Sequence, residues 1–125
     1  GSFGNGAAMR APLLGLLYSD LSDVFAAARQ TAEITHAHPN GILGAELLAG
    51  TANLLAYSDG REKSLLMAAR CLSLNEDFLL RIQVATTWLS LKQTVNPAAV
   101  RQELGNRASA HESCVTAVYL ALRFL

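Results

Sequence analysis

The first ten residues read GSFGNGAAMR (1–10), and a second polar segment reads ITHAHPN (34–40). Three of the first six residues are glycine, which has no side chain to pack and loses the most backbone entropy on ordering. We therefore expect a loop over 1–6. The loop leads directly into the helix-forming run Ala7-Ala8-Met9-Arg10. Because the first amides of a helix have no partner within it, this arrangement predicts an anion site, with phosphate as the natural ligand.

The glycine pattern by itself has low specificity. A dinucleotide-binding fingerprint needs a third glycine where Met9 stands and a strand before the loop, and a P-loop ends in Gly-Lys-Ser/Thr. The sequence has neither feature. A helix-entry turn with polar caps explains the glycines equally well, so these residues alone leave both interpretations open.

Three motifs considered together are more specific. SFGNGAAMR (2–10), ITHAHPNGILGA (34–45) and AHESCVTAVYLALRFL (110–125) follow one another over nearly the whole chain. In this order they resemble the ADP-ribosylglycohydrolase family, which includes the dinitrogenase-reductase-activating glycohydrolases and the ADP-ribosylarginine and ADP-ribosylserine hydrolases. The resemblance implies an all-helical, magnesium-dependent hydrolase. Such an enzyme cleaves the glycosidic bond that joins ADP-ribose to a protein side chain or a small acceptor.

The resemblance also implies which residues bind the ligand. It places the ADP-ribose diphosphate and the neighbouring ribose on the glycine loop, and it assigns the first histidine of the Thr-His segment to the same ligand. The residues concerned are Ser2, Phe3, Gly4, Asn5, Gly6 and His36. The implied partner is an ADP-ribosylated protein or a small ADP-ribose conjugate.

Three further polar residues are candidates for supporting positions around the loop: Arg10, His38 and Glu112. Arg10 can donate to the diphosphate or pair with a buried carboxylate, and its place one helical turn beyond Gly6 favours the structural role. His38 can join His36 at one ligand if a turn precedes Pro39. Glu112 is expected to cap the final helix or to support the glycine loop.

The family's metal motifs are the main departure from the resemblance. Two Mg²⁺ ions are implied, held by a Thr-Asp-Asp motif upstream of the loop and a Gly-Gly-Asp-Thr-Asp motif downstream of the last helix, and neither occurs in these residues. Val115 also stands where members carry proline. We therefore expect 1–125 to be the central portion of a single longer domain, inactive in isolation, although Gly1-Ser2 also fits a cloning remnant.

Other catalytic chemistry finds little support in these residues. His36 and His38 lie on different faces of a helix and lack nearby cysteine or carboxylate ligands for zinc. His111-Glu112 begins like a metalloprotease helix, but Val115 stands where the second histidine belongs. No nucleophile elbow and no pair of loop acids is present. We expect no catalytic residue and no metal ligand within this segment.

Composition narrows the class of protein. The chain has 125 residues, a length that suits one domain, and 51% are hydrophobic while only 16% are charged. Ten basic and ten acidic residues give a net charge of zero, which argues against general nucleic-acid binding. No membrane-length apolar run or signal peptide is present. Two isolated cysteines, Cys71 and Cys114, suit a reducing cytoplasm and are expected to be buried.

The spacing of apolar residues predicts an all-α fold. We expect a compact multi-helix orthogonal bundle of about six to seven helices, part of a larger all-helical domain. Pro12 should kink or divide the first helix, and the segment from Asn40 to Tyr57 should be mostly buried, with small residues that permit close packing. The expected helices cover 7–18, 20–35, 40–57, 61–73, 75–94, 97–104 and 113–125.

Two other functions remain as alternatives. A family descendant without the acidic motifs would bind ADP-ribose and not cleave it. A helical interaction domain would use the glycines only to shape a turn. The two alternatives differ in whether ADP-ribose binds at all, and only the hydrolase releases ADP-ribose from its conjugates.

Overall fold

The computed structural model describes residues 4–36, 38–59, 63–92 and 95–124. In these ranges the chain forms eight helices and no strand, which confirms the all-α prediction. The helices are α1 (Gly6–Arg10), α2 (Pro12–Leu17), α3 (Leu21–Thr35), α4 (Pro39–Tyr57), α5 (Ser64–Arg70), α6 (Glu76–Leu91), α7 (Pro97–Glu103) and α8 (Cys114–Phe124).

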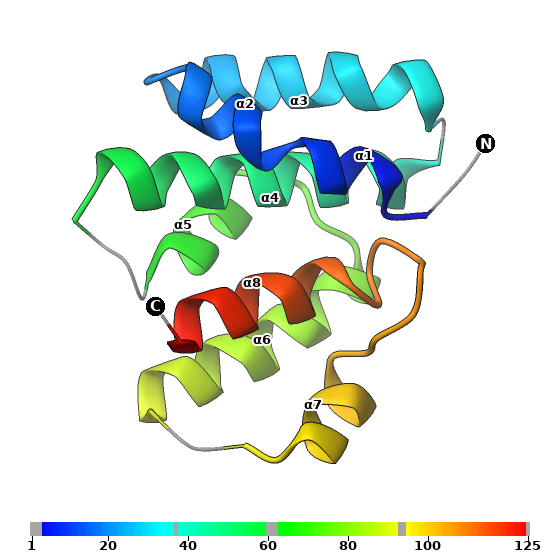
Figure 1. The fold of residues 1–125 in the computed structure, drawn as a ribbon, viewed down its shortest axis with the longest axis vertical. Helices are drawn as coiled ribbons and strands as arrows, with labels where there is room; N and C mark the ends of the chain where they lie inside the picture. The colour runs from blue at the N-terminus through cyan, green and yellow to red at the C-terminus, as the bar shows by residue number, and fades with distance from the viewer. Residues whose placement is uncertain (1–3, 37, 60–62, 93–94, 125) are drawn as a thin grey trace.

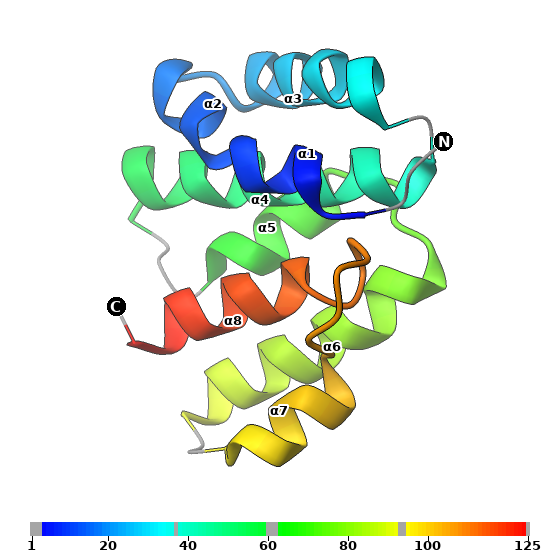
Figure 2. The same cartoon turned by 45° about the vertical axis from the view of Figure 1, so that its right-hand side comes forward.

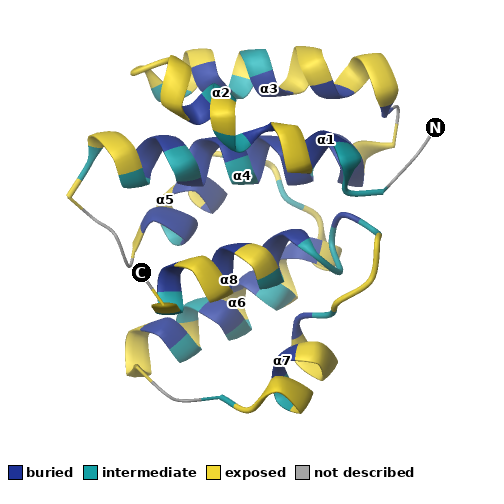
Figure 3. Ribbon diagram, viewed as in Figure 1, coloured by how far each residue is buried: buried dark blue, intermediate teal, exposed yellow. Residues whose placement is uncertain are grey.

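Helix α4 is the centre of the bundle. Helices α1, α2 and α3 pack on one side of it, and α5 and α8 pack on the other (Figure 1). Helix α6 lies against α8, and α7 is farthest from α4; the view in Figure 2 shows the same order. Most of α4 is buried along its length, as Figure 3 shows, which confirms the prediction for this segment.

Small residues allow neighbours to approach α4 closely. A Cβ added at Gly44 would lie 2.9 Å from Sγ of Cys114 on α8, and one at Gly50 would lie 2.5 Å from the ring of Phe25 on α3. On the facing helix α2, a Cβ at Gly15 would lie 2.3 Å from the backbone oxygen of Ala49. Glycine at these positions therefore brings three helices onto α4.

The predicted division of the first helix is also observed. Pro12 begins α2, because proline lacks the N–H that a first helical residue leaves unpaired. The turn after α2 is held by buried Asn53 of α4, whose Nδ2 donates to the backbone oxygens of Tyr18 at 2.7 Å and Gly15 at 3.1 Å. Helix α2 therefore ends on a side chain of the central helix.

Helix ends follow local sequence signals in most places. The Asp20 carboxylate accepts from the Ser22 amide at 2.8 Å, and the Asn96 side chain accepts from the Ala99 amide at 2.8 Å. Helix α6 ends at Leu91, earlier than expected, because Lys92 adopts a left-handed conformation with φ 53°.

The prediction that both cysteines are buried was wrong for Cys71. Cys71 is exposed at the end of α5, whereas Cys114 is buried. None of the described helices is both long and apolar enough to cross a membrane.

Candidate functional site

The glycine loop is fixed to the segment that precedes α8. Gly4 forms an isolated antiparallel bridge with Ser109, and the Asn5 amide donates to the Ala108 oxygen at 2.9 Å. The Asn5 side chain also takes part, since its Nδ2 donates to Oγ of Ser113 at 3.0 Å. These bonds place the start of α1 beside the start of α8, although the two segments are far apart in the sequence.

His36 lies directly against this loop. It follows the last residue of α3, its backbone amide donates to the Ala32 oxygen at 2.7 Å, and only 8% of its surface is exposed. A Cβ built at Gly6 would lie 3.3 Å from Cε1 and 3.5 Å from Nε2 of the His36 ring. The structure thus brings together the two segments that the sequence analysis assigned to one ligand. Ser2 and Phe3 lie outside the described residues.

Among the described residues, Arg10 bonds to a hydroxyl and forms no ion pair with an acidic side chain. Its Nη2 donates to Oγ1 of Thr35 at 3.0 Å, and the same hydroxyl lies 2.7 Å from Nδ1 of His36. The expectation of a structural role therefore agrees with this geometry, but the partner is a hydroxyl rather than the expected buried carboxylate. Thr35 was not predicted from the sequence, although its position next to His36 was the available signal.

His38 caps helix α4. Its Nδ1 accepts a hydrogen bond from the Asn40 amide at 3.1 Å, and the residue is exposed. A side chain that accepts from the first turn satisfies an amide that would otherwise lack a partner. The structure thus gives His38 a local contact that accounts for its place before Pro39.

Glu112 holds the segment that pairs with the loop. Its Oε1 accepts from Oγ of Ser109 at 2.6 Å, and Arg107 lies 3.8 Å from its other carboxylate oxygen. The hydrogen bond from Ser109 is the main reason that the pKa of Glu112 is lowered. Because Ser109 is also the backbone partner of Gly4, Glu112 stabilises the glycine loop indirectly.

A polar network next to the loop was not predicted. Nδ2 of buried Asn40 donates to Asp77 at 3.0 Å and lies 3.3 Å from Nδ1 of His111. Nδ2 of Asn75 donates to Oδ1 of the same Asn40 at 2.6 Å. The network joins the starts of α4 and α6 to the segment before α8. An asparagine at the start of an otherwise apolar helix was the one local signal for it.

The described residues offer no obvious metal centre. Among them, no three His, Cys, Asp or Glu side chains gather closely enough to hold an ion. The described residues thus offer no three-ligand site for either Mg²⁺ ion that the resemblance implies. A carboxyl group elsewhere, that of Glu46 on α4, is buried, and Nη1 of Arg29 lies 3.6 Å from its Oε1. Burial raises the pKa of this carboxyl group.

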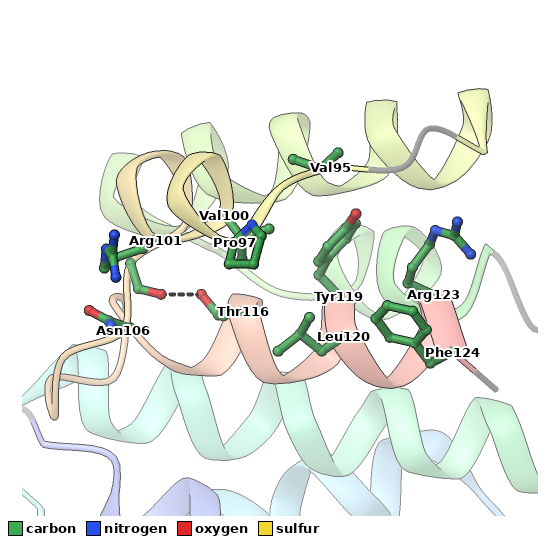
Figure 4. A pocket seen from close by; sticks show the side chains of 11 residues that line it. Val95, Pro97, Val100, Arg101, Asn106, Thr116, Tyr119, Leu120, Arg123 and Phe124 are labelled. Carbon is green, nitrogen blue, oxygen red and sulfur yellow. Dashed lines mark hydrogen bonds between the residues drawn. The ribbon is translucent and has the colours of Figure 1, made fainter.

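An apolar cavity of about 350 Å³ lies elsewhere, between α7 and α8 (Figure 4). Its wall includes Val100, Tyr119, Leu120 and Phe124, and Oγ1 of Thr116 donates to the Gly105 oxygen at 2.6 Å beside it. None of the loop and histidine residues described above lines this cavity. The described residues of the glycine loop and His36 therefore lie outside this cavity.

Comparison with known proteins agrees with the resemblance drawn from the three sequence motifs. A family model described as ADP-ribosylglycohydrolase matches residues 1–125. The chain belongs to this family. The chain is 36% identical to an ADP-ribosylhydrolase ARH3 from Gallus gallus and 33% identical to one from Homo sapiens, with 98% of the chain covered in both cases.

These relatives are longer than the matched region. The chain spans 38% of the Gallus gallus protein and 39% of the Homo sapiens protein. The matched part of the ADP-ribosylglycohydrolase family thus includes the glycine loop, His36 and the segment before α8. Both relatives are named as ADP-ribosylhydrolases.

Proposed function

We propose that this chain forms the ADP-ribose-binding part of an ADP-ribosylglycohydrolase. The proposal depends above all on the contact between Gly6 and His36, which brings the glycine loop and an imidazole to one surface. Backbone amides near a helix start and a ring N–H are suitable donors for the oxygens of a diphosphate. Helix α1 has only five residues, and the Asn5 amide already donates to Ala108, so we assign the binding to His36 and to the other amides of the loop rather than to a long helix dipole.

The described part of the loop, Gly4 and Asn5, is suited to this role because contacts within the protein already set its position. Gly4 and Asn5 are held by Ser109, Ala108 and Ser113, so little ordering is required on binding. A preorganised site loses less conformational entropy than a flexible one. We assign Ser2 and Phe3 to the same ligand from the family motif alone.

The proposed reaction is hydrolysis of the bond between ADP-ribose and a protein side chain or a small acceptor. Within the described residues we find no metal cluster, and we propose that the Mg²⁺ ligands and the group that activates water lie outside 1–125. Those groups would supply the chemistry, while the present residues bind and orient the ADP-ribose. Cytoplasmic location is part of the same proposal.

The binding claim is tested by calorimetry with ADP-ribose on the full-length protein. His36→Leu removes the ring donor, and the affinity should fall by about tenfold, equivalent to about 1.4 kcal/mol for one hydrogen bond to a charged group. Ile34→Ala is the matched control, since Ile34 lies two residues away and is 82% exposed. Equal affinity of the His36→Leu and wild-type proteins would refute the assignment of His36.

The hydrolase claim needs a separate assay. Full-length protein is incubated with peptides ADP-ribosylated on arginine or serine, with Mg²⁺ and with a chelator, and released ADP-ribose is measured. Release that depends on Mg²⁺ supports the proposal. Tight binding without release would instead indicate a non-catalytic ADP-ribose-binding module, and absence of binding would indicate a helical interaction domain.

A further inference from the structure

Thr35 and Arg10 form a hydrogen-bonded chain that ends on the ring of His36. Nη2 of Arg10 lies 3.0 Å from Oγ1 of Thr35, and this oxygen lies 2.7 Å from Nδ1 of His36. The opposite edge of the ring, with Cε1 and Nε2, faces Gly6. One edge of the imidazole is therefore occupied by a hydroxyl, while the other faces the glycine loop.

The direction of these bonds follows from what each group can do. A guanidinium has donors and no acceptor, so the Arg10–Thr35 bond uses a lone pair of the Thr35 oxygen. Donation from a cation polarises the hydroxyl, which strengthens it as a donor and weakens it as an acceptor for a second bond. The Thr35 proton then has an acceptor at 2.7 Å, the Nδ1 atom of His36.

We infer that Arg10 and Thr35 are positioning residues that fix His36 in the tautomer with its proton on Nε2. In this form the ring presents an N–H donor to the Gly6 side of the site. The ligand group bound there must then be an acceptor, such as a phosphoryl oxygen. This inference rests on the proposed function for the identity of the ligand, while the tautomer itself is independent of it.

Thr35 differs from Thr31 in its hydrogen-bond partners. Thr31, one turn earlier on α3, bonds only to the backbone oxygens of Ala27 at 3.0 Å and Ala28 at 3.1 Å. Such bonds satisfy a hydroxyl within its own helix and touch no other group. Thr35 stands at the end of α3, and its hydroxyl is bonded to two side chains instead. Thr31 is therefore a matched control for Thr35.

The tautomer is read by NMR on full-length protein labelled with ¹⁵N histidine, without ligand, with His36 assigned from its loss in His36→Gln. We expect a protonated Nε2 and an unprotonated, hydrogen-bonded Nδ1. Thr35→Val should move the Nδ1 resonance toward that of an unbonded ring, while Thr35→Ser and Thr31→Val should leave it unchanged. A proton on Nδ1 in the wild type, or no response to Thr35→Val, would overturn the inference.

Calorimetry with ADP-ribose supplies the second readout. Thr35→Val should weaken binding by about fivefold, as expected for one hydrogen bond, and Thr35→Ser should restore it. If the wild type binds and Thr35→Val binds equally well, the positioning role is wrong. If the wild type does not bind, the proposed function fails, and the NMR result alone decides the tautomer.

Discussion

Gly15 and Gly6 both admit a neighbour at close range, but the neighbours are of different kinds. Gly15 on α2 meets the backbone of α4, where an added Cβ would lie 2.3 Å from the Ala49 oxygen and 2.8 Å from the Asn53 nitrogen. Gly6 meets a side chain, with 3.3 Å to Cε1 of His36. The first contact joins two helices, and the second sets the position of one ring.

The difference predicts that Gly15 and Gly6 respond differently to substitution. Backbone within a packed helix cannot move without disturbing its own hydrogen bonds, whereas a side chain can shift by a few tenths of an ångström. Substitution of Gly15 should therefore affect stability, and substitution of Gly6 should mainly affect binding. Four experiments test this separation.

The largest effect is expected for Gly15→Ala. The added methyl group would overlap the α4 backbone, and we expect a loss of about 3 kcal/mol in the free energy of unfolding, the upper part of the range for overpacking. Urea denaturation followed by circular dichroism measures it. Leu13→Ala on the same helix is the control, since Leu13 is 61% exposed and should change stability by only about 0.5 kcal/mol. A stable Gly15→Ala protein would contradict the rigid contact.

Asn53→Ala should have the next largest effect. The substitution leaves the Tyr18 and Gly15 oxygens without their donor, and Asn53 is only 2% exposed. We expect a loss of about 2 kcal/mol in the free energy of unfolding, from buried acceptors without partners. The same urea titration is used, with Ala52→Ser as a conservative neighbour. An unchanged midpoint would show that water replaces the Asn53 amide fully.

Gly6→Ala should separate binding from stability. The new methyl group would press on the His36 ring at 3.3 Å, so the ring must move away from the loop. We expect ADP-ribose affinity to fall by about tenfold, while the free energy of unfolding changes by less than about 1 kcal/mol. Calorimetry and urea titration on one sample give both values. A large loss of stability with intact affinity would reverse the assignment of this contact to the site.

The smallest effect concerns Glu46, which is buried on α4. Burial raises the pKa of its carboxyl group above the ordinary 4.5, so the folded state favours the protonated form. The protonated carboxyl group of Glu46 therefore makes its full contribution to stability below pH 4.5. This contribution is lost as the pH rises through the pKa of Glu46 in the folded state. Glu46→Gln should be more stable than the wild type at pH 7, and the gap should close in acid. Thermal unfolding from pH 4 to 7 checks this, and a wild type that is more stable at pH 7 would refute it.

Much of the fold could be predicted because its signals are local. Asp20, Pro39 and Asn96 mark helix starts through their own side chains or rings, and the apolar spacing of 40–57 identified the central helix. The error at Cys71 has a local cause too, since the apolar pattern around it does not show that α5 ends there. The pattern of neighbouring residues does not determine which side of a short helix faces solvent.

The site was only partly predictable because its contacts are remote in sequence. The glycines of the loop were expected to make a loop and not to serve packing, but Gly6 is a helical residue without a positive φ. Gly6 instead makes room for the ring of His36. Asn5 and Ser113 are bonded although they are 108 positions apart in the sequence, and Asn40 and His111 are 71 positions apart. No local pattern indicates such pairs.

The bond between Asn5 and Ser113 has a consequence for how the molecule assembles. Closing a loop of this length costs entropy that is recovered only when the intervening helices have packed. The proposed ADP-ribose site is then expected to be among the last parts to form, and partly folded chains would lack it. If the site binds as proposed, retention on immobilised ADP-ribose would select molecules in which Asn5 and Ser113 have already met.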